Sequence, residues 1–147
     1  MSRPIDTMHR PLIRHGFILI LLALVGAFFI PAMAFPRLGL SAHTVGVLGG
    51  VLMIAVGGVF SAFSLPARLR SLLALSWATA GYLNWLGCLL GASLGAGRAT
   101  PISARGAVGP DWAEYLSGGI LVLAALASLL AVGLSIWGLR SGSADET

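Results

Sequence analysis

Charge is scarce in this chain of 147 residues: 10% of them are charged and 57% are hydrophobic, whereas soluble domains carry about 25% charged residues. Lysine is absent, so all nine positive side chains are arginines, and the formal net charge is +4. The single cysteine, Cys88, excludes an intrachain disulfide, a Cys-x-x-Cys-His haem attachment and cysteine-rich zinc or iron–sulfur sites. The sequence also contains no GxGxxG, P-loop or His-Glu-x-x-His motif.

Four long apolar segments are present, and they predict an all-α integral membrane protein that folds as one four-helix bundle. About 20 apolar residues suffice for a helix to cross a bilayer. The expected transmembrane helices are 12–32, 41–65, 72–95 and 115–139. The whole chain, 1–147, forms a single membrane domain with a basic arm at 1–15, a glycine- and proline-rich loop at 97–114 and a polar tail at 140–147.

The first span has two further features. Pro31 is expected to bend the helix or end it early. The string Ala32-Met33-Ala34, behind a basic arm and an apolar core, also resembles the cleavage site of a secretory signal. Three more spans follow, and they favour an uncleaved first helix.

The arginines predict the orientation in the membrane. Four spans place both termini on one side, together with Arg3, Arg10, Arg14, Arg68, Arg70 and Arg140. The opposite side carries only Arg37, Arg98 and Arg105. Because positive residues concentrate in cytoplasmic segments, we expect both termini in the cytoplasm, with the bundle in the bilayer of a bacterial inner membrane. Arginines at the ends of apolar runs do not indicate a nucleic-acid partner.

His43 is the candidate functional centre. It is the only histidine beyond the basic arm, and no charged side chain follows it before Arg68. An imidazole at membrane depth needs a partner or takes part in chemistry. His43 is therefore either a structural residue bonded to a nearby carbonyl or the axial ligand of a haem iron. Because the spans hold no second histidine, the sixth iron position would stay open for substrate.

Glycines recur at helical spacing in the second and third spans. Gly46 and Gly50 follow His43 by three and seven residues and so share its face. Close helix packing and a planar cofactor lying along that face both explain them. For the third span, close packing is the preferred explanation of Gly87, Gly91 and Gly95.

Asn84 lies in the middle of the third span. A buried amide needs hydrogen-bond partners, so Asn84 either ties this span to a neighbour or orients a polar group of the substrate. Nearer the span ends, tryptophans are expected as membrane-interface anchors, namely Trp77, Trp112 and Trp137. Asp111 and Glu114 are expected to be solvated loop charges.

Several strings of the sequence resemble the hydroxylaminobenzene mutases, small membrane enzymes that rearrange N-phenylhydroxylamine to 2-aminophenol. These are Arg14-His15-Gly16-Phe17, Pro36-Arg37-Leu38-Gly39-Leu40-Ser41-Ala42-His43, Asn84-Trp85-Leu86 and Pro101-Ile102. The chain is more distantly similar to styrene oxide isomerase, a four-helix membrane enzyme that forms a trimer with b-type haem and converts an epoxide to an aldehyde.

The resemblance implies an isomerase with haem b, a homotrimer and a small aromatic substrate. It makes His43 the axial ligand of the haem iron. The helix face that His43 shares with Gly46 and Gly50 is then expected to be the cofactor face. It makes Asn84 the catalytic residue, since Asn84 falls in register with a third-helix asparagine of styrene oxide isomerase. The expected substrate pocket contains Gly49, Trp85 and Cys88.

The chain also departs from these relatives. The mutases have Glu and Asn where this chain has Val45 and Gly49, and styrene oxide isomerase has a functional Asn at Gly49 and a functional Tyr at Cys88. We therefore predict an aryl hydroxylamine mutase. An epoxide isomerase and a non-enzymatic membrane haem or subunit protein remain as alternatives.

Overall fold

The computed structural model describes residues 9–140, which form four long helices and no strand. The long helices are α1 (His9–Ala27), α2 (Pro36–Gly58), α3 (Ala67–Leu94) and α5 (Asp111–Gly138). Short helical segments lie in the connections, namely η2 (Ile30–Ala32), η3 (Phe60–Ala62) and α4 (Pro101–Ala104). All four long helices are long and apolar enough to cross a membrane. The predicted all-α, four-helix membrane fold is confirmed.

Three helices begin several residues earlier than predicted, because prolines taken as loop markers are helix starts. Pro36 is the first residue of α2, where its missing N–H costs no hydrogen bond. Pro66 and Pro110 directly precede the first residues of α3 and α5. The arginines after Pro66 therefore lie on the first turn of α3 and not in a loop.

The first two helices also differ from the predicted ranges. α1 begins at His9, inside the stretch assigned to the basic arm, and ends at Ala27, before Pro31, as expected. α2 ends at Gly58 and not at residue 65. Beyond it, Phe60 and Phe63 are each 2% exposed and fold back over the end of the bundle. The apolar run therefore continues after the helix has ended.

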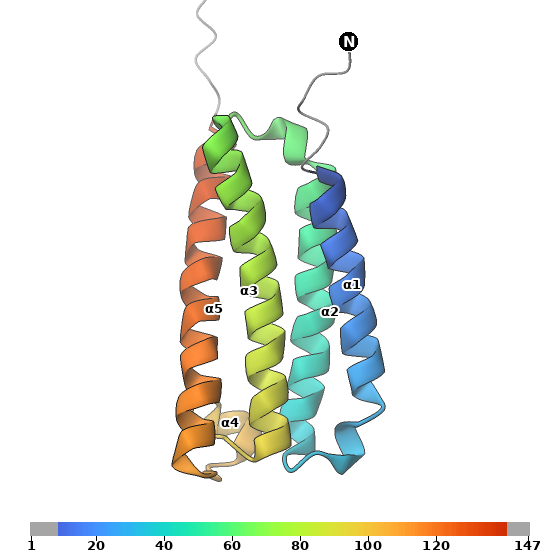
Figure 1. The fold of residues 1–147 in the computed structure, drawn as a ribbon, viewed down its shortest axis with the longest axis vertical. Coiled ribbons are helices and arrows are strands. Elements are labelled where there is room, and N and C mark those ends of the chain that lie inside the picture. The colour runs from blue at the N-terminus through green and yellow to red at the C-terminus, as the bar shows by residue number, and fades with distance from the viewer. Residues whose placement is uncertain (1–8, 141–147) are drawn as a thin grey trace, which may run out of the picture.

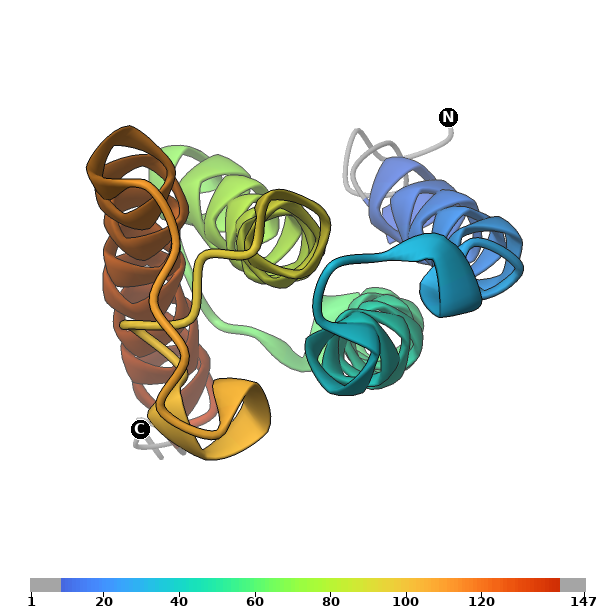
Figure 2. The same ribbon diagram turned by 90° about the horizontal axis from the view of Figure 1, so that it is seen from below.

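The helices are arranged in the order α1, α2, α3, α5 across the molecule (Figures 1 and 2). α1 packs on α2, α2 packs on α3, and α3 packs on α5, whereas the described residues of α2 and α5 scarcely touch. α3 is therefore the floor of a space that α2 and α5 flank.

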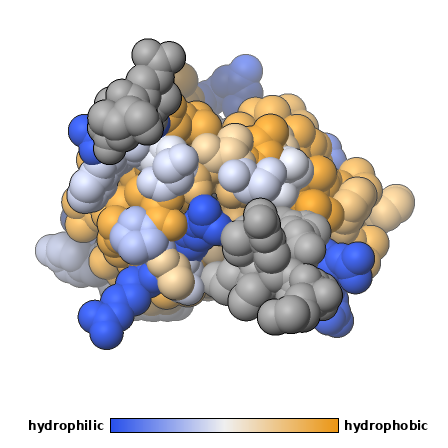
Figure 3. All heavy atoms as spheres, turned by 90° about the horizontal axis from the view of Figure 1, so that it is seen from above, coloured by the Kyte–Doolittle hydropathy of each residue, from blue (hydrophilic) through white to orange (hydrophobic). Residues whose placement is uncertain are grey.

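The two ends of the bundle carry the arginines as predicted. α1 begins and α5 ends at the same end of the molecule (Figure 1), where α3 also begins with Arg68 and Arg70. Figure 3 looks onto this end and shows hydrophilic residues, most of them near its edges, with hydrophobic residues between them. Arg3 lies outside the described residues.

Glu114 fixes the loop between α3 and α5, and the prediction that it is a solvated charge is wrong. Its side chain is 4% exposed. Its carboxylate accepts backbone N–H bonds from Gly97 at 3.0 Å, Arg98 at 2.8 Å and Gly109 at 2.7 Å. Asp111 does stay at the surface, where it pairs with Arg98 at 3.0 Å. Because α5 starts at Asp111, Glu114 lies on its first turn, beneath the loop.

Candidate active site

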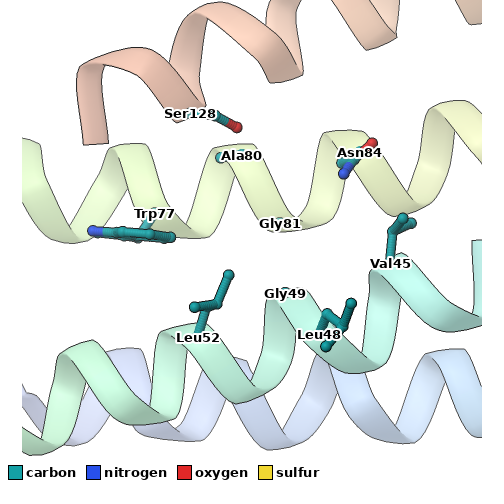
Figure 4. Close-up of a pocket in the computed structure, with 9 residues that line it drawn as sticks. All are labelled: Val45, Leu48, Gly49, Leu52, Trp77, Ala80, Gly81, Asn84 and Ser128. Carbon is teal, nitrogen blue, oxygen red and sulfur yellow. The ribbon is translucent and has the colours of Figure 1, made fainter. Parts of the chain in front are cut away.

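A cavity of about 250 Å³ lies between α2, α3 and α5. Figure 4 shows the nine residues that line it, from all three helices. They are Val45, Leu48, Gly49 and Leu52 of α2, Trp77, Ala80, Gly81 and Asn84 of α3, and Ser128 of α5. The walls are mainly apolar with few polar groups, as is typical of small-molecule sites.

Asn84 lies at one end of this cavity (Figure 4), where its side chain is half-buried. The other polar side chains that line the cavity bond elsewhere: Trp77, at the opposite end, bonds to Ser135, and Ser128 bonds within its own helix. The amide of Asn84 has no protein partner among residues 9–140. The sequence left two roles for Asn84, a hydrogen bond between helices and contact with the substrate. The geometry favours contact with a bound group.

Trp77 lies at the other end of the cavity, and the prediction that it is an interface anchor is wrong (Figure 4). Its indole Nε1–H donates to the Ser135 hydroxyl at 3.1 Å, which fixes the ring against α5. The prediction failed because α3 starts at Ala67, so Trp77 lies almost three turns inside the helix.

His43 lies on the second turn of α2 and is half-buried on the side of α1. Its Nδ1–H donates to the carbonyl of Ala23 at 3.1 Å. This bond fixes the tautomer in which Nε2 carries a free lone pair, the form that binds metals. His15 lies on the first turns of α1 and bonds to Tyr82, away from His43 as predicted.

The donor set fits a haem iron better than a bare metal ion. Residues 9–140 hold no group of three His, Cys, Asp or Glu side chains that could bind a metal together. A haem iron takes four ligands from its macrocycle and needs only one axial imidazole. His43 Nε2 can supply that ligand, although His43 does not line the cavity described above.

Gly46 packs closely against α1 and α3, Gly50 packs closely against α1, and neither leaves room for a flat cofactor. A Cβ at Gly46 would lie 2.6 Å from both the Ala23 Cβ and a ring carbon of Trp85. A Cβ at Gly50 would lie 2.5 Å from the carbonyl oxygen of Gly16 and from a side-chain carbon of Ile20. The structure assigns both glycines to close helix packing and not to the expected cofactor face.

Of the three residues expected in the substrate pocket, Gly49 lines the cavity, whereas Trp85 and Cys88 do not. Gly49 lines the cavity together with Asn84. Trp85 packs over Gly46, and Cys88 is 6% exposed within an apolar cluster. The other buried members of that cluster are Leu38, Ala42 and Ala92.

Five lining residues were not singled out from the sequence, namely Leu48, Leu52, Ala80, Gly81 and Ser128. Ser128 and Ser135 are seven residues apart, which places both on one face of α5. The seven-residue spacing of these serines could have indicated which face of α5 packs against α3.

A family model described as styrene oxide isomerase matches residues 8–140. The chain belongs to the styrene oxide isomerase family. Hydroxylaminobenzene mutase HabB of Ectopseudomonas oleovorans is 41% identical over 137 residues, which cover 92% of this chain and 83% of that protein. Hydroxylaminobenzene mutase HabA of the same organism is 36% identical over 100 residues, covering 66% and 73%. No solved structure matches the chain.

Membership of the styrene oxide isomerase family identifies the chain as an isomerase, as the resemblance implied. Its four apolar helices make it an integral membrane protein. The matched residues contain all of α1 to α5, so both the cavity and His43 lie within the match.

Proposed function

We propose that this isomerase rearranges an aryl hydroxylamine to an aminophenol inside the membrane. The observation that carries the proposal is the amide of Asn84, which has no protein partner among residues 9–140 and lies at the end of a mainly apolar cavity. The names of the two mutases support a hydroxylamine as the reacting group. An apolar cavity between helices suits the aryl ring.

The residues of the cavity have separable roles. Val45 and Leu48 bind the ring next to Asn84 and, together with Leu52, keep bulk water from the reacting atoms. Asn84 binds the hydroxylamine: its amide N–H donates to the substrate oxygen, and its carbonyl accepts the substrate N–H. The N–O bond breaks, a C–O bond forms at the neighbouring ring carbon, and the proton of that carbon moves to the nitrogen. The product is an isomer, so no electrons are gained or lost.

A b-type haem is the proposed cofactor, held by His43 Nε2 while Ala23 fixes the other ring nitrogen. When bound, it would supply a Lewis-acidic iron, the kind of centre that can polarise a substrate oxygen. Because His43 lies outside the cavity of its own protomer, we propose a homotrimer with the cofactor between protomers. Native mass spectrometry in mild detergent should show trimers, and monomers alone would contradict this assembly.

An aryl epoxide is the second candidate substrate, supported by the description of the matching family model. The same cavity would bind the aryl ring, and Asn84 would bind the epoxide oxygen. The bond that breaks would then be C–O and not N–O.

Anaerobic turnover tests the proposal. The detergent-purified protein, without reductant or nucleotide, should convert N-phenylhydroxylamine to 2-aminophenol. Asn84→Leu keeps the side-chain volume but removes both polar atoms, and should lower kcat/KM by roughly 100-fold. The control is Thr44→Val, because Thr44 is exposed and bonds only to its own helix. Full activity in Asn84→Leu, or no conversion of this substrate or of an aryl epoxide, would contradict the proposal.

A further inference from the structure

The cavity is longer than one aromatic ring requires. Asn84 and Trp77 close its two ends and are seven residues apart on α3 (Figure 4). That separation is about two helical turns, or roughly 10 Å along the axis. An apolar cavity of ~150 Å³ takes up a benzene molecule, whereas this cavity measures about 250 Å³. A single ring placed at Asn84 would leave the space next to Trp77 empty.

The middle of the cavity, between its Asn84 end and its Trp77 end, has a smooth floor (Figure 4). Gly49 of α2 meets Gly81 of α3 there, and a Cβ on Gly49 would lie 3.4 Å from the Gly81 Cα. Ala80 adds only a methyl group beside them. No side chain of these three residues rises from the floor, so one flat group can lie along it between the Asn84 end and the Trp77 end, with Leu52 of α2 beside it (Figure 4).

The polar groups toward the Trp77 end of the cavity already have hydrogen-bond partners. The Trp77 Nε1–H donates to Ser135, and the Ser128 hydroxyl donates to the Ala124 carbonyl at 2.8 Å. An apolar group can therefore lie against both side chains without leaving a buried donor unpaired. A second aromatic ring also gains contact with the indole of Trp77. These features favour a second ring at this end over a polar substituent.

We infer that this isomerase takes a two-ring aryl hydroxylamine, with its N–O group at Asn84 and its second ring between Ala80 and Trp77. The identity of the reacting group rests on the proposed function, whereas the site for the second ring rests on the cavity alone. The cavity opens between α2 and α5, where Leu48 and Leu52 are 56% and 47% exposed. A two-ring substrate dissolved in the bilayer reaches the site through this opening.

The test compares N-(2-naphthyl)hydroxylamine with N-phenylhydroxylamine on the purified protein. The wild type should prefer the naphthyl substrate by about tenfold in kcat/KM. Ala80→Leu fills the Trp77 end of the cavity, and should abolish this preference by acting on the naphthyl substrate alone. Ser128→Val fills the same end from α5 and should act in the same direction. Ala125→Leu, an equal enlargement at an exposed position of α5, should change neither substrate.

Binding of 2-naphthol, followed by its fluorescence, separates the two proposals. If neither hydroxylamine is converted, but 2-naphthol binds to the wild type and more weakly to Ala80→Leu, the two-ring site stands and the proposed function fails. A wild-type preference for the phenyl substrate, or equal losses for both substrates in the folded Ala80→Leu and Ser128→Val variants, would overturn the two-ring site. Loss of haem from both variants would also overturn it, because the cavity would then belong to the cofactor.

Discussion

One buried carboxylate holds the loop between α3 and α5 in place. Glu114 accepts three backbone N–H bonds from residues on both sides of that loop. Glu114→Gln removes the charge and turns an N–H donor toward these donors, which should lower the free energy of unfolding by about 2 kcal/mol. Unfolding by SDS, followed by circular dichroism, measures the effect.

Asp111→Asn is the matched control, because the side chain of Asp111 is 78% exposed in its pair with Arg98. An exposed ion pair contributes about 0–1 kcal/mol, so this variant should unfold close to the wild type. Equal losses in the two variants would mean that Glu114 has no special role in the loop.

His43 is predicted to carry the cofactor through a single nitrogen. His43→Ala removes Nε2, and should abolish the Soret band and the isomerase activity together. His15→Ala should retain both the Soret band and the activity. His15 lies on the first turns of α1, away from His43, and bonds there to Tyr82 of α3. The haem content is measured by the pyridine haemochrome. Normal haem in His43→Ala would show that another residue binds the iron.

At the scale of the helices, the contact between α1 and α2 depends on glycine. A Cβ at Gly50 would meet the backbone of Gly16 at 2.5 Å, and backbone cannot move aside as a flexible side chain can. Gly50→Ala should therefore force the helices apart and lower the free energy of unfolding by roughly 1–3 kcal/mol. The SDS concentration at which half of the protein is unfolded should therefore be lower for Gly50→Ala than for the wild type.

Gly133→Ala on α5 is the control for this effect. A Cβ there meets nothing within 4 Å, and alanine favours a helix over glycine by up to about 1 kcal/mol. The control should be neutral or stabilising. A Gly50→Ala protein as stable as the Gly133→Ala protein would contradict the close α1–α2 contact.

The sequence alone predicts the four helices, because each long apolar run has only one way to satisfy its backbone in a membrane. It does not predict their first residues, since Pro36, Pro66 and Pro110 mark a helix start and a loop equally well. A start placed five residues late at α3 also placed Trp77 near the membrane surface and hid its role in the cavity.

The site could be predicted only in part from sequence. Asn84 and Gly49 stood out by their residue type and by the resemblance, and both line the cavity. Ser128 and Ala80 are ordinary residues of apolar helices, and only the pairing of α3 with α5 brings them together. The burial of Glu114 depends on the path of the loop over α5, which no local pattern encodes.

At the scale of the whole molecule, the arginines predict the topology. The end at which α1 begins and α5 ends is also the end of Arg68 and Arg70. Reporter fusions after Arg70 and after Thr147, expressed in a bacterial inner membrane, should both report the cytoplasm. A fusion in the loop at Gly106 should report the opposite side. A periplasmic signal after Arg70 or Thr147 would contradict the orientation.

Labelling with heavy oxygen tests most directly the central claim that the substrate isomerises inside a cavity closed to bulk water. The purified protein converts N-phenylhydroxylamine under anaerobic conditions in water enriched in heavy oxygen, and mass spectrometry measures the label in 2-aminophenol. We predict an unlabelled product, because the oxygen that leaves the nitrogen returns to the same molecule. A product that carries solvent oxygen would contradict the account, since hydroxide would then have left and water would have been captured.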